Sequence, residues 1–398
     1  MNNKGLALKA VILLSYTYTM MATTFIIPIM GNLVQVFPDA GTKISMLISL
    51  PSLIMIPAIL LSGYLSKYIS KKTILIIGSV LYIIGGLGGG FYDNIDFILV
   101  MRAIGGLGTG LVFPLVPALI AQLYHGNQVP QMIGWGNATG SICSMIFATV
   151  TGYLAVLNWH NAFYLYAIYI LLLIAQIIIL PKVPPEKQDV NVLQAKEKSK
   201  LNWLAYIYVL ATFVYMVISM VYIVRVSVFI AQENIGNSAQ AGMASSVVSV
   251  SALIITLIFA QIYKAFQRYT FIIGFAATAL CFILLGISKT FSTIAIASVF
   301  MGISLGLVLP YLMTNITKIL PKAARTTGVS FISTSMYIGQ FLAAYFVAFL
   351  ESMTGSTRTS FTVSGVILVI IAVISVVFIL ATKKQFSTLY VADDSVNS

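Results

Sequence analysis

Long apolar runs alternate with short polar segments along the whole chain. Twelve of these runs have about 20 residues or more, the length that a helix needs to cross the hydrocarbon core of a membrane. We therefore predict an all-α membrane protein with twelve transmembrane helices. The runs cover residues 8–30, 44–66, 73–92, 96–123, 131–157, 162–181, 203–230, 241–263, 270–288, 292–318, 327–350 and 361–382.

One polar stretch divides the chain in the middle. Pro181–Leu201 is rich in Lys and Pro and has no apolar periodicity, which is typical of a linker. We predict an N-terminal six-helix half over 1–181, a cytoplasmic linker over 182–201, a C-terminal six-helix half over 202–382 and a cytoplasmic tail over 383–398.

A basic loop in the first half, Ser62–Lys72, recurs in the second half about 197 residues later, and a pattern of glycines and a proline recurs at nearly the same offset. Landmarks that repeat in one order at one offset predict two pseudo-symmetric halves. The matched pairs are Gly63 with Ala260, Leu65 with Ile262, Lys67 with Lys264, Lys71 with Arg268, Gly106 with Gly302, Gly110 with Gly306, Pro114 with Pro310 and Gly134 with Gly328.

Composition excludes a water-soluble protein. The chain is 59% hydrophobic and 8% charged, whereas a soluble domain has roughly 25% charged residues. The net charge of +12 lies mostly in segments between the apolar runs, so we interpret it as a topology signal and not as a nucleic-acid surface. The two cysteines lie in separate apolar runs, which predicts neither a disulfide framework nor a metal site.

The lysines and arginines also predict the orientation. With the N-terminus in the cytoplasm, the inner segments carry 17 of them and the outer segments carry 3. Positively charged loops stay on the cytoplasmic side of a membrane. We therefore expect a multi-pass protein of the inner (plasma) membrane of the cell, with both termini in the cytoplasm.

The basic loop and helix four resemble sequence motifs of the major facilitator superfamily. The loop matches the family pattern at Gly63, Leu65, Ser66, Lys71 and Lys72. It departs from the pattern at Lys67, where the family has an aspartate, and at Ser70, where the family has a second glycine. Helix four carries an arginine followed by a glycine-rich run, from Arg102 to Gly110, as the family does.

The resemblance implies a secondary active transporter that moves small organic molecules by alternating access. Within the family, the chain is most similar to bacterial twelve-span exporters of drugs or metabolites. The glycine–proline motif of many drug/proton antiporters is weak here, because no proline lies between Gln131 and Leu157. The gating or coupling positions that the resemblance implies are Arg102, Gly63, Lys67, Lys71, Lys72, Gly106, Gly110 and Pro114.

Two charged residues fall deep inside the predicted helices, and both are arginines. Arg102 has two open interpretations, a gate or relay residue and a structural residue that satisfies carbonyl groups of adjacent helices. Arg225 either attracts an anionic group of a substrate or forms interhelical hydrogen bonds, and in the second case it extends toward the outer surface of the membrane or pairs with Glu233. The carboxylates lie in loops or at the ends of the predicted spans, as Asp96 does, so proton coupling depends on whether Glu233 or Glu351 turns inward from a helix end.

A polar and aromatic stripe follows helix seven at spacings of 4, 3, 4, 3 and 3 residues, which is one face of a helix. Such a face lies toward a cavity or another helix and not toward lipid. With hydroxyl and amide side chains on helices one, five and eleven, it predicts a polar substrate cavity near the midplane. The predicted cavity residues are Tyr208, Thr212, Tyr215, Ser219, Tyr222 and Arg225, with Thr19, Thr23, Asn137, Ser141, Thr334, Tyr337 and Gln340.

We therefore predict a transporter that exports drugs or metabolites. The alternative is an organic-anion uptake or exchange carrier that uses the embedded arginines. The sequence argues against an enzyme, because the apolar runs carry no Asp cluster, His-rich metal set or Ser–His pair. The expected partners are a small-molecule substrate, the lipid bilayer and protons as coupling ion, with no nucleic acid and no cofactor, and the expected state is a monomer.

Overall fold

The computed structural model describes residues 3–126, 128–181, 203–320 and 325–381. These residues form helices joined by short turns, with no β-strand among them. Ten helical stretches in this part of the chain are long and apolar enough to cross a membrane. The segmented run 3–36 and the last helix, α18 (Thr357–Ala381), complete the twelve spans, so the predicted fold class is confirmed.

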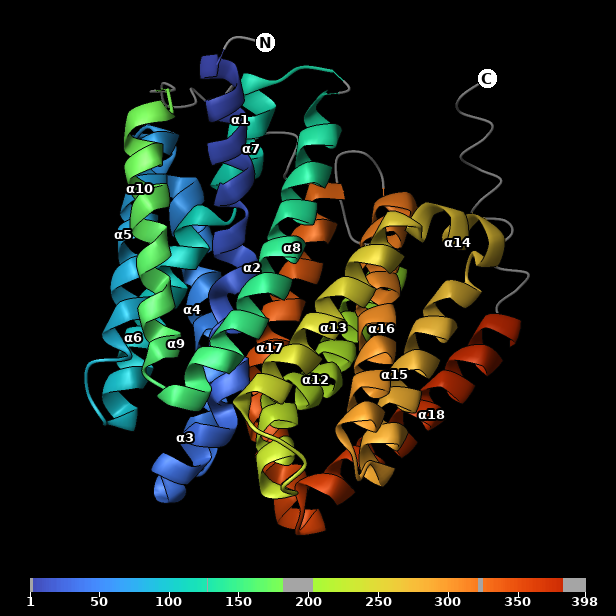
Figure 1. Cartoon of the computed structure of the whole chain (residues 1–398). Coiled ribbons are helices and arrows are strands. Elements are labelled where there is room, and N and C mark those ends of the chain that lie inside the picture. The colour runs from blue at the N-terminus through green and yellow to red at the C-terminus, as the bar shows by residue number, and fades with distance from the viewer. Residues whose placement is uncertain (1–2, 127, 182–202, 321–324, 382–398) are drawn as a thin grey trace.

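The N-terminal half lies beside the C-terminal half, the first in blue to green and the second in yellow to red in Figure 1. Its first, fourth and sixth spans are each divided into shorter helices. Its elements are α1 (Asn3–Ser15), α2 (Thr17–Thr24), η1 (Ile27–Ile29), α3 (Met30–Val36), η2 (Pro38–Ala40), α4 (Thr42–Leu65), α5 (Lys71–Gly88), α6 (Ile95–Val112), α7 (Leu115–Leu123), α8 (Gln128–Leu157), α9 (Asn161–Tyr164), η3 (Leu165–Ala167) and α10 (Ile168–Ile179).

The C-terminal half is more continuous, and a short helix follows its second span. Its elements are α12 (Trp203–Gln232), α13 (Ser238–Leu257), α14 (Phe259–Phe266), α15 (Tyr269–Ile287), α16 (Phe291–Ile319), α17 (Arg325–Thr354) and α18. The predicted linker over 182–201 and the predicted tail over 383–398 lie outside the described residues.

Prolines mark two of the divisions that the apolar runs did not predict. Pro28 lies within η1, and Pro114 separates α6 from α7. Proline has no backbone N–H and clashes with the preceding helical turn, so a helix breaks or bends there. Pro310, the repeat partner of Pro114, lies inside the continuous α16. A proline at this position therefore permits a break without forcing one.

The sequence repeat appears again in how glycines pack the helices. A side chain at Gly106 would place its Cβ 2.8 Å from the Cα of Pro51 on α4. A side chain at Gly302 would place its Cβ 2.5 Å from the carbonyl oxygen of Val248 on α13. Small residues allow membrane helices to approach this closely. The predicted pseudo-symmetry of the two halves is therefore confirmed in their helix packing.

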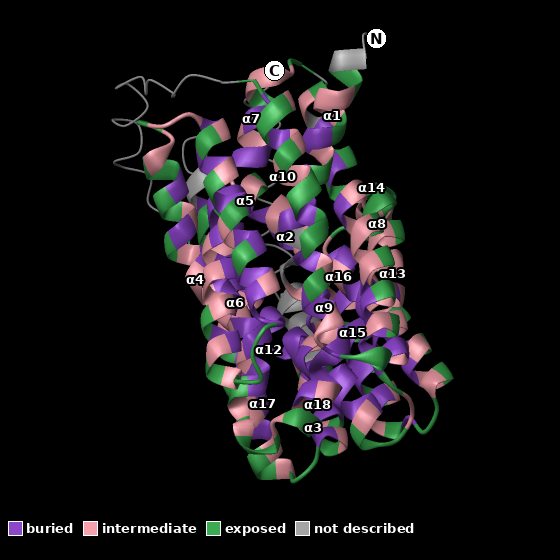
Figure 2. Cartoon of the chain, turned by 60° about the vertical axis from the view of Figure 1, so that its left-hand side comes forward, coloured by how far each residue is buried: buried purple, intermediate pink, exposed green. Residues whose placement is uncertain are grey.

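The two halves are bonded to each other toward one end of the bundle. We call the end with Asn3 and Ala381 the termini end, and the end with α3 and the start of α18 the far end (Figure 1). Side-chain hydrogen bonds join α3 to α12 and α8 to α13 between the midplane and the far end. One hydrophobic cluster includes parts of both halves, and a second cluster stays within the N-terminal half. Buried residues gather around α12 (Figure 2).

Candidate functional site

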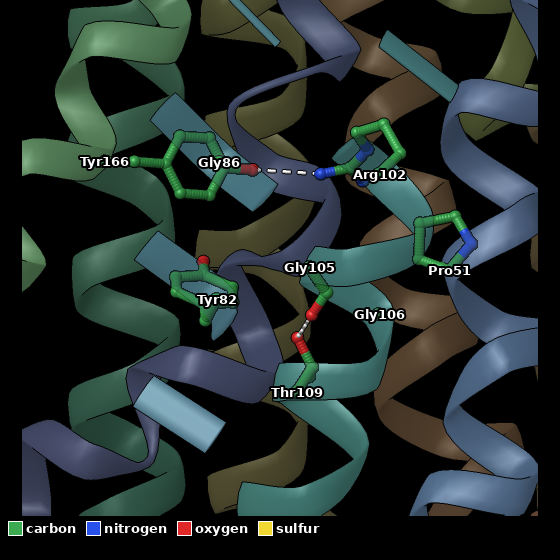
Figure 3. A pocket seen from close by; sticks show the side chains of 8 residues that line it. All are labelled: Pro51, Tyr82, Gly86, Arg102, Gly105, Gly106, Thr109 and Tyr166. Atoms are coloured by element: carbon green, nitrogen blue, oxygen red, sulfur yellow. Dashed lines mark hydrogen bonds between the residues drawn. The ribbon is translucent and has the colours of Figure 1, made fainter. Parts of the chain in front are cut away.

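Arg102 lies on α6 and is 3% exposed. Its Nε donates to the carbonyl oxygen of Leu47 on α4 at 2.8 Å. A terminal nitrogen donates to the hydroxyl of Tyr166 at 3.0 Å (Figure 3). In a regular helix that carbonyl would accept from the N–H of residue 51, which here is a proline. Arg102 therefore satisfies a carbonyl that Pro51 leaves without an intrahelical donor. These contacts fit the structural interpretation, and the gating role stays a prediction.

A pocket borders Arg102 and is walled by glycine backbone and aromatic rings (Figure 3). It has no room for a water molecule, whereas sites that bind drug-sized molecules have volumes of roughly 300–1,000 Å³. We therefore assign it to the scaffold that holds α4, α5 and α6 together. Its lining residues are Pro51, Tyr82, Gly86, Arg102, Gly105, Gly106, Thr109 and Tyr166.

The stripe predicted on helix seven lies on α12 and turns into the C-terminal half. The hydroxyl of Tyr215 pairs with Ser304 of α16 at 2.9 Å, and that of Tyr222 pairs with Ser298 of α16 at 2.6 Å. The smaller hydroxyls, on Thr212 and Ser219, donate to carbonyl groups of α12 itself. In this conformation the stripe faces another helix, one of the two placements that its pattern allowed. Its contact with a substrate stays a prediction.

Arg225 forms an ion pair with Glu351 of α17, and the two side chains are 10% and 24% exposed. Glu351 also accepts a hydrogen bond from the hydroxyl of Thr357 at 2.9 Å. Glu233 instead pairs with Arg358 at 2.7 Å, so the alternative of an Arg225–Glu233 pair is wrong. The sequence could not select Glu351 as the partner, because the two residues are 126 positions apart. The available signal was the location of Glu351 near the end of a span.

Gln340 of α17 links the two halves. Its Oε1 accepts from the hydroxyl of Ser52 on α4 at 2.8 Å, and its amide nitrogen lies 3.8 Å from the sulfur of Met216 on α12. Three residues earlier on α17, the ring of Tyr337 meets the ring of Phe113 edge-on, with 6.0 Å between centroids. The structure thus brings two of the predicted helix-eleven residues to a contact between the halves.

The other predicted cavity residues lie at intermediate or exposed positions. Asn137 is exposed, and the side chain of Thr19 lies outside the described part of the chain. Their substrate contacts stay predictions. The half-buried residues are Thr23, Ser141, Tyr208 and Thr334.

Sequence reasoning missed a row of hydroxyl contacts between α8 and α13. Thr149 pairs with Ser246 at 2.7 Å, and Ser144 lies 3.5 Å from Ser249. Hydroxyl groups of this kind join membrane helices across an interface. The recurring serines of α13 were the signal, but periodicity alone does not say which helix they face.

The basic loop divides into exposed and buried parts. Lys67 is exposed, and nothing lies within 4 Å of the place where a side chain at Gly63 would begin. Lys72 donates to the carbonyl oxygens of Ile177 and Leu180, at 2.7 and 2.6 Å. A cation is favoured there because the last carbonyl groups of a helix lack partners and carry partial negative charge. Lys72 therefore fixes the end of α10, and its gating role stays a prediction, as does that of the 3% exposed Lys71.

Two curated relatives are named for drug resistance. The aminotriazole resistance protein of Saccharomyces cerevisiae is 33% identical over 154 residues, which cover 37% of this chain and 28% of that protein. The quinolone resistance protein NorA of Staphylococcus aureus is 24% identical over 186 residues, which cover 46% of this chain and 47% of that protein. The matched stretch therefore spans less than half of either relative.

Solved structures with the same fold cover nearly the whole chain. The D-xylose-proton symporter aligns with a TM-score of 0.75 at 17% identity, covering 93% of this chain and 97% of that chain. The nucleoside transporter NupG aligns with a TM-score of 0.73 at 15% identity, covering 95% and 99%. At these identities the likeness shows the fold alone. The family model of the Major Facilitator Superfamily matches residues 12–228 and 207–390. The chain belongs to the Major Facilitator Superfamily.

Proposed function

We propose that this transporter exports small organic molecules, drugs or metabolites, across the plasma membrane by alternating access. The observation that carries the proposal is the similarity to two relatives that are named for drug resistance. Neighbours in fold include a symporter, so the fold does not set the direction of transport.

The distribution of charge supports an orientation with both termini in the cytoplasm. The described acidic residues lie at the far end, and three of the five exposed lysines among the described residues lie at the termini end, the side that the positive-inside rule assigns to the cytoplasm. The other two, Lys43 and Lys289, lie at the far end. In this orientation the conformation with bonds between the halves at the far end is inward-facing. The halves 1–181 and 202–382 then rock against each other. The acidic residues are Asp39, Asp93, Asp96, Glu233 and Glu351, and the lysines include Lys67, Lys264 and Lys318.

The Arg225–Glu351 pair supports neutral or cationic substrates over anions. An anion carrier of the predicted kind needs a guanidinium that is free to attract a carboxylate. A terminal nitrogen of Arg225 is already paired with Glu351. Arg102 donates hydrogen bonds to the Leu47 carbonyl and to the Tyr166 hydroxyl. An anion that took the place of Glu351 would leave that carboxylate partly buried without its partner, which is unfavourable.

Glu351 is also the carboxylate through which protons would couple to transport. Its side chain is 24% exposed, against 35% for Glu233 and 65% for Asp96. Protonation would remove the negative charge that holds Arg225, and so would loosen α12 from α17 near the far end.

Purified protein in proteoliposomes with an imposed pH gradient tests the proposal. We expect the gradient to drive transport of a cationic dye, with at least a tenfold lower rate in Glu351→Gln. Ser245→Ala is the control, because the Ser245 hydroxyl donates only to a carbonyl of its own helix. Exchange of small carboxylates that does not depend on the pH gradient and is abolished by Arg225→Gln would contradict the proposal and favour the anion carrier.

A further inference from the structure

The first span is divided where its repeat counterpart is continuous. Residues 3–36 form α1, α2, η1 and α3, whereas α12 runs unbroken from Trp203 to Gln232. The division nearest the far end covers Phe25–Ile29 and contains Pro28. Sharp bends in helices arise at prolines and at such interruptions.

Side chains of the C-terminal half hold α3. The Ser227 hydroxyl of α12 donates to the carbonyl oxygen of Pro28 at 2.8 Å and accepts from the backbone N–H of Gly31 at 3.1 Å. That N–H is among those that the start of a helix leaves without an intrahelical partner. Ser238 of α13 donates to Asn32. A Cβ at Gly31 would lie 2.8 Å from the Ser227 carbonyl oxygen, so the two backbones are in direct contact.

The hydrophobic packing changes at the same division. Up to Phe25, the buried apolar residues of the first span belong to a cluster confined to the N-terminal half. From Ile26 onward they belong to the cluster that also contains the core of the C-terminal half. Among the elements around it, α3 packs mainly against α12. The first span therefore has two packing environments, and they meet at Phe25–Ile26.

We propose that Ser227 is a positioning residue that keeps α3 on the C-terminal half, and that the first span bends at Phe25–Ile29 when the far end opens. The inference rests on the proposed alternating access. A rigid first span would pull α3 from α12 and break both hydrogen bonds of Ser227, which is 3% exposed. A bend preserves them and places the motion where the helix is already irregular.

Two engineered disulfides distinguish these motions in a background without the native cysteines. Gly31→Cys with Ala231→Cys joins α3 to α12, since a Cβ at Gly31 would lie 2.9 Å from that of Ala231. Gly152→Cys with Gly242→Cys joins the halves directly, since a Cβ at each would lie 3.1 Å from the Cα of the other. We expect oxidation of the first pair to leave dye transport within twofold of the reduced protein, and oxidation of the second to lower it at least tenfold. Loss of transport with both bridges would overturn the proposal.

Distances between spin labels give a second readout that does not depend on transport. Labels at Val36 on α3, Tyr92 in the N-terminal half and Lys289 in the C-terminal half occupy exposed positions at the far end. In nanodiscs we expect a narrow 36–289 distance distribution and broader 36–92 and 92–289 distributions. Ser227→Ala should broaden the 36–289 distribution, and Ser245→Ala should not.

The two readouts separate this inference from the proposed function. If the two cysteine variants transport no dye even in their reduced form, the proposed export is contradicted. The spin-label distances would still test whether α3 stays on the C-terminal half. A 36–92 distribution narrower than the 36–289 distribution, or a 36–289 distribution that Ser227→Ala leaves unchanged, would overturn the inference.

Discussion

The two halves share a scaffold of close-packed helices but differ in the polar groups inside it. In the N-terminal half, Pro51 leaves a helix carbonyl without a donor, and Arg102 of the neighbouring helix donates to it. In the C-terminal half, Val248 stands at the position that corresponds to Pro51 and lies against Gly302. Ser298 stands at the position that corresponds to Arg102, and it forms a hydrogen bond with Tyr222. The proline and the arginine are present together in one half and absent together in the other. A buried charge in this protein can therefore compensate for a backbone defect in the adjacent helix.

The second embedded arginine answers a different need. Arg225 has no backbone defect to satisfy and instead pairs with a carboxylate on another span, close to the far end. Two arginines that look equivalent in the sequence thus have different partners: a carbonyl and a hydroxyl in one half, and an ion pair in the other. The shared scaffold and the divergent interior can be tested separately.

The largest effect should come from the shared glycine contacts. Gly106→Leu and Gly302→Leu would each force a side chain into the backbone of the adjacent helix, so each should destabilise the protein by about 3 kcal/mol. Gly134→Leu is the matched control, because nothing lies within 4 Å of a Cβ there. Thermal unfolding in detergent measures all three. A large loss of stability in only one of Gly106→Leu and Gly302→Leu would contradict a scaffold common to both halves.

The next effect concerns the proline and arginine of the N-terminal half. Arg102→Leu should destabilise the protein by about 2 kcal/mol, because it leaves the Leu47 carbonyl without a donor. In a Pro51→Ala background the N–H of residue 51 can supply that donor, so the loss should fall to about 1 kcal/mol. The double-mutant cycle by thermal unfolding measures the coupling. Equal losses in the two backgrounds would show that Arg102 does not compensate for Pro51.

The ion pair of the C-terminal half should give a somewhat smaller effect. Glu351→Ala leaves Arg225 partly buried without its partner, and we expect a loss of about 1.5 kcal/mol, less than the ~3–5 kcal/mol of a fully buried pair. Arg225→Leu with Glu351→Leu should be no worse than the single change, since it removes both charges. Chemical unfolding in mixed micelles measures both variants. A double variant much less stable than the single one would contradict the account.

The smallest effect should come from the hydroxyl pair Tyr222–Ser298, in which Ser298 corresponds to Arg102 of the N-terminal half. Tyr222→Phe removes one buried hydrogen bond, which contributes about 1 kcal/mol. Ser298→Ala removes the same bond and also the bond that the Ser298 hydroxyl donates to the carbonyl oxygen of Ile294 within α16. The double variant should be little worse than Ser298→Ala alone, because that change already removes the bond to Tyr222. A loss of stability as large as that of Arg102→Leu would show that this pair stabilises the protein as much as the buried arginine does.

The architecture could be predicted from the sequence because each span carries its own signal. An apolar run of about 20 residues identifies a membrane helix without knowledge of its neighbours, and the recurrence of Gly106 and Gly110 as Gly302 and Gly306 identified the repeat. The same reasoning could not predict the divisions of the first span, because apolar composition continues through Pro28.

The candidate site could be predicted only in part. Spacing placed Tyr215 and Tyr222 on one face of a helix, but it could not tell whether that face meets a cavity or the serines of α16. The partner of Arg225 and the hydroxyl of Ser52 that meets Gln340 are set by contacts between residues more than 100 positions apart. Such contacts follow from the packed fold and leave no local pattern.

The proposed export of small organic compounds is tested most directly in everted membrane vesicles from cells that express the chain. Imposing a proton gradient that is acidic inside, we predict accumulation of a cationic dye that collapses with the gradient and falls at least tenfold in Glu351→Gln. Vesicles that accumulate no dye, yet exchange small carboxylates regardless of the gradient, would contradict the account.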